Sequence, residues 1–124
     1  MTDSRSLAVD EFRRDWEEAL ALTGTLPRQV PERAPVDEVT ERLCGHVELL
    51  IFQLDKAVNE MAEDIPDRET ARWLLVRARR TLADGPGGTD RSAAVRAEDL
   101  ALGCRALTSL LALVSRPIAL ATSS

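Results

Sequence analysis

One long helical pattern, VDEVTERLCGHVELLIFQLDKAVNEMAE, occupies residues 36–63 of this 124-residue chain and constrains its fold more than any other feature. Apolar side chains recur in it at steps of three and four residues, which is the period of one side of an α-helix. They are Val36, Val39, Leu43, Val47, Leu50, Leu54, Val58 and Met61. The pattern predicts a central helix that packs against a core along one narrow stripe.

The same segment carries a second line of residues on the opposite side of the helix. Gly45, Leu49, Phe52 and Lys56 follow one another at steps of four, three and four residues. Glycine costs about 1 kcal/mol in a helix interior relative to alanine, so a close packing partner at Gly45 is a natural compensation. Two interpretations stay open: this side forms a dimer interface or peptide groove, or the N-terminal helix of the same chain covers it.

Three further helices are predicted, at about residues 6–23, 67–83 and 92–115. Pro66 separates the second helix from the third, the segment DGPGGT predicts a loop before the last helix, and Pro117 is expected to end that helix. No alternating pattern typical of β-strands appears. We therefore predict an all-α fold with a single domain over residues 1–124, a bundle of three long helices plus the N-terminal helix.

The segment TLPRQVPERAP, residues 25–35, predicts a linker. Pro27, Pro31 and Pro35 are spaced by four residues, which excludes a helix and favours a stiff, extended chain. Such an arm can carry the N-terminal helix across its own bundle or onto a neighbouring subunit. Together with the second line on the central helix, it predicts a homodimer in which N-terminal helices can be exchanged.

Composition argues against several classes of partner. The formal net charge is −5, whereas a nucleic-acid-binding domain needs a basic surface. No apolar run approaches the roughly 18 residues of a membrane span, and the first residues lack the apolar segment of a signal peptide. We expect a cytoplasmic protein with no membrane partner and no nucleic-acid partner.

Few residues could carry chemistry, and each has a structural alternative. His46, the only histidine, lies at the edge of the predicted core stripe and could carry a proton or bind a ligand, or could be a hydrogen-bonded boundary residue. Cys44 and Cys104 could form a nucleophile or a disulfide, but we favour buried, unreactive thiols. One histidine and two distant cysteines lack the spacing of a zinc site, so no metal is expected.

The run RLCGHVELL, residues 42–50, contains the pattern G-H-V-x-x-L within a long helix. It resembles a family of small all-α proteins of high-GC soil bacteria, a family of unknown function linked to natural-product gene clusters, over about residues 36–114. The size, acidity and proline arm are also similar to the lysinoalanine-forming enzymes of duramycin and cinnamycin biosynthesis. That resemblance implies a homodimer acting on a modified precursor peptide, a lanthipeptide, by adding a lysine amine to a dehydroalanine of the same peptide.

This reaction needs no cofactor, and none is expected. A free lysine has a pKa of about 10.4, so a base must take its proton, and a carboxylate of the peptide can do so. Holding the reacting atoms in place can itself lower the barrier by roughly 7–11 kcal/mol. No catalytic residue can be assigned.

We predict that the peptide binds in a cleft where the N-terminal helix, carrying Phe12, crosses the bundle. The residues expected to bind it are Trp16, His46, Phe52, Gln53, Arg72 and Trp73. The competing hypothesis is a non-catalytic dimeric helical module that binds a regulatory partner or a carrier protein of a biosynthetic operon.

Overall fold

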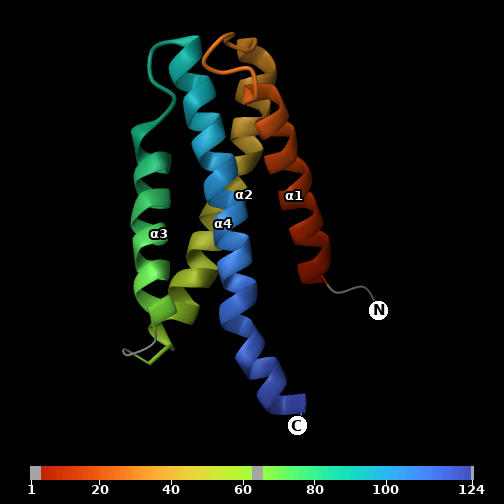
Figure 1. The fold of residues 1–124 in the computed structure, drawn as a ribbon, viewed down its shortest axis with the longest axis vertical. Coiled ribbons are helices and arrows are strands. Elements are labelled where there is room, and N and C mark those ends of the chain that lie inside the picture. Colours follow the sequence, from red (N-terminus) through yellow and green to blue (C-terminus); the bar gives the residue numbers. More distant parts are fainter. Residues whose placement is uncertain (1–3, 63–65, 124) are drawn as a thin grey trace.

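The computed structural model describes residues 4–62 and 66–123, and these residues form four α-helices joined by short connections (Figure 1). The helices are α1 (Ser4–Thr23), α2 (Arg33–Asn59), α3 (Pro66–Asp84) and α4 (Asp90–Ser123). The described residues contain no β-strand, which confirms the predicted all-α class. Consecutive helices run in opposite directions along the long axis of the molecule.

Helices α2 and α4 form the centre of the bundle. They run in the same direction and share the most extensive helix contact, with α1 on one side of the pair and α3 on the other (Figure 1). Both α1 and α3 contact the central pair, but their described residues do not contact each other. The N-terminal helix is therefore a full member of a flattened bundle of its own chain.

The core follows the predicted stripe of α2. Seven of the eight predicted residues, Val36 to Val58, are buried, and Met61 packs partly buried against them. Helix α4 supplies the opposing surface with Leu100, Cys104 and Leu107. Burying one Leu or Val side chain contributes about 1.5–3 kcal/mol, so this stripe dominates the stability of the bundle.

The ends of two helices differ from the predictions. Helix α2 ends at Asn59, because the Glu60 N–H bonds to the carbonyl of Ala57 at 3.2 Å and tightens the last turn. Residue 63, the predicted end, lies outside the described residues. Helix α4 continues through Pro117 to Ser123, so the predicted end was wrong. A proline removes one N–H from a helix, and a local bend can accommodate it without ending the helix.

Helix α4 is 34 residues long. Neither α4 nor any other helix in the described ranges combines the length and the apolar character that a membrane span requires.

The proline-rich linker was predicted to be extended over residues 25–35, but residues 25–29 form turns and α2 begins at Arg33, so that Pro35 lies in the first turn of a helix. The Leu26 N–H bonds to the carbonyl of Thr23 at 3.1 Å, and the Gln29 N–H bonds to that of Thr25 at 3.0 Å. The Thr25 hydroxyl donates back to the carbonyl of Gln29 at 2.9 Å. These local hydrogen bonds outweigh the preference of isolated prolines for an extended chain, and they return the chain to its own bundle.

The loop between α3 and α4 is a plain turn, as its composition predicts. Gly85 and Gly87 have φ angles of 72° and 76°, which favour glycine. Thr89 caps α4: its hydroxyl accepts from the Ser92 N–H at 3.0 Å, and the Ser92 hydroxyl accepts from the Thr89 N–H at 3.1 Å. This reciprocal pair satisfies two free backbone donors and fixes where α4 begins.

The thiol of Cys104 provides a test of the core. The residue is completely buried in α4, and burial raises the pKa of its thiol from 9.0 to about 12. Above pH 9 the unfolded chain loses this proton while the folded chain keeps it, so the free energy of unfolding must fall as pH rises.

We predict that wild-type protein loses about 1 kcal/mol of stability between pH 8 and pH 10 through this thiol. Urea unfolding of the wild type and of Cys104→Ala at both pH values measures the difference. The variant should lack this component, and Cys44→Ala, which removes a half-buried thiol, should retain it. An equal pH dependence in the wild type and Cys104→Ala would contradict the prediction.

Candidate functional site

A buried polar cluster joins α1 to α2. Asp15 of α1 accepts from Arg42 Nε at 3.1 Å through Oδ1, and its Oδ2 lies 2.6 Å from His46 Nε2. The side chains of Asp15 and His46 are only 7% and 15% exposed. Arg42 also pairs with Glu18 on the exposed side of the cluster. Both carboxylate oxygens of Asp15 thus have a partner, as a buried charge requires.

The imidazole of His46 is also held by packing. The ring of Phe12 lies against it with a centroid distance of 4.5 Å. With one face on Phe12 and Nε2 on Asp15, His46 has the contacts of a hydrogen-bonded boundary residue, the structural alternative that the sequence left open. Its main contribution is to fix how α1 sits on α2.

The sequence contained one signal for this cluster. Asp15 lies close in the helix to Phe12, Trp16 and Ala19, three apolar residues that α1 buries. A charged side chain on the apolar side of a helix needs a partner on the neighbouring helix. The sequence alone could not identify Arg42 and His46 as its partners, because that depends on the register of α1 against α2.

The structure does not gather the residues predicted to bind the peptide into one cleft. Trp16 is buried in the core, and His46 lies between α1 and α2. Phe52 and Gln53 are exposed on α2, and Arg72 and Trp73 are exposed on α3. Because α1 and α3 lie on opposite sides of the central pair, Trp16 and Trp73 cannot line a common cleft within one chain.

The second line on α2 is not covered by α1. Leu49 and Phe52 remain 44% and 71% exposed, and a Cβ atom built on Gly45 would meet no heavy atom within 4 Å. The interpretation that the N-terminal helix of the same chain covers these residues is therefore wrong.

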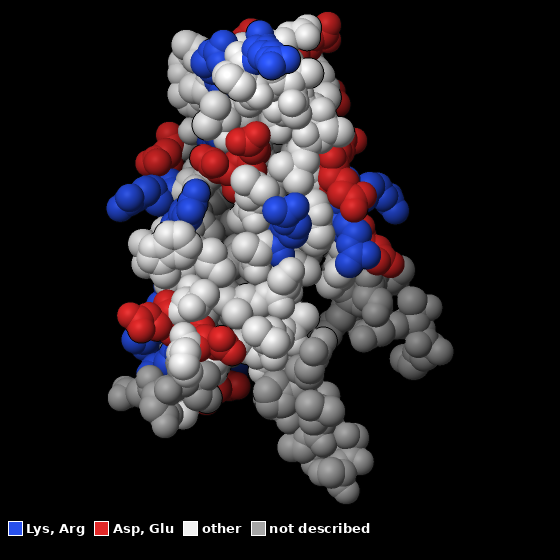
Figure 2. Space-filling view, viewed as in Figure 1, with Lys and Arg blue, Asp and Glu red and all other residues white. Residues whose placement is uncertain are grey.

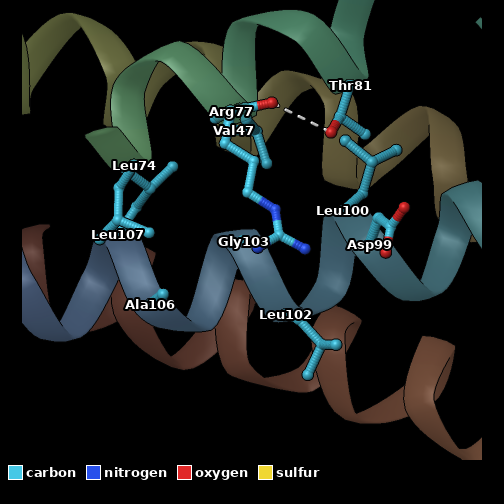
Figure 3. Close-up of a pocket in the computed structure, with 11 residues that line it drawn as sticks. Val47, Leu74, Arg77, Thr81, Asp99, Leu100, Leu102, Gly103, Ala106 and Leu107 are labelled. Carbon is cyan, nitrogen blue, oxygen red and sulfur yellow. Dashed lines mark hydrogen bonds between the residues drawn. The ribbon is translucent and has the colours of Figure 1, made fainter. Parts of the chain in front are cut away.

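A groove between α3 and α4 is a concave site lined by described residues (Figure 3). Its volume is about 220 Å³. Residues of both helices and one from α2 line it: Val47, Leu74, Arg77, Ala78, Thr81, Asp99, Leu100, Leu102, Gly103, Ala106 and Leu107. Most are apolar, which is typical of sites that bind organic ligands.

Small residues on α4 keep the groove open. Arg77 reaches from α3 toward Gly103, and Leu74 and Leu107 face each other farther along (Figure 3). A Cβ atom on Gly103 would meet no heavy atom within 4 Å, so space remains above this position. The Arg77 guanidinium carbon lies 5.5 Å from the centre of the Trp73 ring, which places Trp73 beside the groove.

The groove carries one charged residue of each sign, Arg77 on α3 and Asp99 on α4, and both are exposed. Figure 2 shows uncharged surface interrupted by separate groups of acidic and basic side chains on this side of the molecule, some near its middle and others at its edges. No three His, Cys, Asp or Glu side chains of the described chain are placed to hold a metal ion. The groove can therefore hold an apolar ligand and anchor one charge at each wall.

We take the α3–α4 groove as the candidate site, because it is open while the Asp15 cluster is closed by its own contacts. Of the predicted residues, only Trp73 lies at its edge. The sequence had one usable signal, the glycine at position 103 inside the most apolar helix, since an interior glycine often marks a close approach or an open surface.

We predict that Asp15→Asn lowers the free energy of unfolding by about 1–3 kcal/mol, because it removes the charge that partners Arg42 and His46. Chemical denaturation measures this loss. Glu18→Gln is the control, because its exposed ion pair with Arg42 should contribute less than about 1 kcal/mol. Equal losses in the two variants would show that burial of the pair is unimportant.

Neither a curated protein nor a solved structure matches this chain significantly. The profile of a family of unknown function (DUF6415) matches residues 10–114, a range that begins within α1 and includes the whole candidate groove. The chain therefore belongs to this family of unknown function.

Proposed function

We propose that this protein binds a modified precursor peptide in the α3–α4 groove and promotes lysinoalanine formation in it. The observation that carries the proposal is an open apolar groove with one anchoring charge on each wall. The nature of the reaction comes from the resemblance to lysinoalanine-forming enzymes. An apolar groove with a few charged anchors is the kind of site that a ring-constrained, largely apolar peptide requires.

Each part of the groove has a task in this proposal. Leu74 and Leu107 contact the apolar part of the peptide. Asp99 holds the lysine ammonium by a charge-assisted hydrogen bond, and Arg77 donates to the carbonyl conjugated with the dehydroalanine alkene. Arg77 thereby stabilises the negative charge that develops on that carbonyl oxygen as the amine adds.

The addition balances without a cofactor. The lysine nitrogen forms a bond to the β-carbon of dehydroalanine as the π bond of the alkene breaks, the nitrogen loses one proton to the base, and the α-carbon gains one proton back from the protonated base. In this proposal a carboxylate of the peptide takes the proton from nitrogen, and the groove contributes mainly by holding amine and alkene together. Replacing a single polar side chain of the protein should then slow ring closure of the bound peptide less than loss of a general base does, which is typically 10²–10⁴-fold.

We predict that Gly103→Leu abolishes peptide binding and ring closure together, because its side chain fills the space above position 103. Gly103→Ala is the matched control: one methyl group leaves most of the groove open, and alanine stabilises the helix by up to about 1 kcal/mol. Asp99→Asn should weaken binding by about three- to tenfold, as expected for one exposed charged contact.

The assay uses a dehydrated, thioether-bridged peptide that retains one lysine and one dehydroalanine. Because addition leaves the mass unchanged, unreacted dehydroalanine is trapped with a thiol and counted by mass spectrometry. Peptide affinity is measured separately by calorimetry. Full activity of Gly103→Leu would exclude the groove, and binding without ring closure in the wild type would exclude the reaction.

A non-catalytic module is the second candidate, and one observation favours it. The residues best suited to chemistry do not line the groove: His46 is held by Asp15, and the pKa of the buried Cys104 thiol is raised to about 12. In that case the groove binds an apolar segment of a partner protein. Binding of the peptide with no acceleration of ring closure by catalytic amounts of protein would identify this function.

A further inference from the structure

We propose that the outer side of α2 binds a second copy of this chain, with the two α2 helices packed side by side in antiparallel orientation. The proposal concerns residues outside the groove and does not depend on the proposed function. It assigns a partner to the surface formed by Glu41, Gly45, Leu49, Phe52 and Lys56, which we call the outer side of α2.

The centre of this surface is apolar, with a side chain that protrudes at one position and no side chain at another. Phe52 is 71% exposed, the largest fraction for a large apolar side chain within residues 9–62 and 66–114, and Leu49 next to it is 44% exposed. At Gly45, two turns away, a Cβ atom would meet nothing within 4 Å. The protruding Phe52 ring of one helix can pack over Gly45 of a second copy of the same helix that runs in the opposite direction.

The order of charges selects the orientation. Glu41 and Lys56 lie at equal distances from the point between residues 48 and 49, and so do Gly45 and Phe52. A two-fold axis at that point places Phe52 over the partner's Gly45 and Lys56 beside the partner's Glu41, each contact occurring twice. A parallel pair would instead bring like charges together, which disfavours it.

The spacing of these residues suits helix–helix packing. From Glu41 to Lys56 they follow at steps of four, four, three and four residues. This spacing is close to the 3.5-residue repeat of helices that pair in a coiled coil. One helix from each subunit makes a small interface, so we expect dissociation in the micromolar range and not the nanomolar range.

Chemical cross-linking tests the register directly. Lys56 is the only lysine of the chain. A carbodiimide forms a direct amide between Lys56 and a carboxylate in contact with it, and within one helix Glu41 lies about 22 Å away. We therefore expect a cross-linked peptide that joins Glu41 to Lys56 and appears only in the dimer fraction. A dimer fraction without it would overturn the antiparallel register.

Sedimentation velocity over a concentration series tests the interface. Phe52→Ala should weaken dimerisation at least about tenfold, because it removes the central aromatic contact. Val76→Ala, which shortens an exposed side chain on α3, is the control and should change nothing. A wild type that stays monomeric at about 100 μM, or equal effects of the two variants, would overturn the proposal.

Swapping the charges at positions 41 and 56 by mutation distinguishes this antiparallel pairing from other dimers. Glu41→Lys and Lys56→Glu should each weaken the dimer, and the double variant should restore it, since the two contacts are then reversed together. Gly45→Ala should raise the stability of the helix yet weaken the dimer, because its methyl group occupies the space for Phe52. Failure of the double variant to restore dimerisation would exclude the Glu41–Lys56 contact.

Discussion

The contact between α2 and α4 determines the rest of this structure. Both helices bury one stripe against the other, and Leu43, Leu50 and Leu107 lie in that shared layer with almost no exposure. Because the two helices run in the same direction, the chain must return through α3 at one side to pass from α2 to α4, and α1 lies at the other side. The side helices therefore never meet, and the outer sides of α2 and α4 stay uncovered by the described chain. In the usual four-helix bundle all four helices surround one core, and more of the surfaces of α2 and α4 would then be buried.

The side helices are held by different means. Helix α3 contributes Leu75 and two small residues, Ala71 and Ala78, to the core, and its contact with α4 leaves a groove. Helix α1 buries the larger Phe12 and Trp16, and Asp15 adds a directional contact to Arg42 and His46. Apolar contacts tolerate small shifts along a helix, whereas a buried carboxylate loses its partners when the register changes. The polar cluster thus specifies one position for α1, and the looser packing of α3 leaves space for a ligand.

Sequence periodicity predicted what depends on a single helix. The buried stripe of α2 and the glycine turn before α4 follow from local spacing and local chemistry. It failed where several helices must be placed at once: Trp16 and Trp73 were predicted to share a cleft, but periodicity does not say which helices are neighbours. The same limit explains why the groove was missed, since Leu74 and Gly103 lie on different helices and form a site only through the α3–α4 contact. The folded linker was missed because its turn depends on hydrogen bonds of Thr23 and Thr25.

The two uncovered surfaces of the central pair differ in chemistry, and this difference separates their roles. The groove side is concave and carries its charges, Arg77 and Asp99, at the walls, so it suits a ligand that enters between two helices. The outer side of α2 is convex at Phe52 and flat at Gly45, with charges at both ends, so it suits a helix with the same pattern. In Figure 1 α2 lies behind α4. The residue that α2 contributes to the groove, Val47, belongs to its buried stripe and not to its outer side. A dimer formed through α2 would leave both grooves accessible, and loss of the dimer would leave each groove intact.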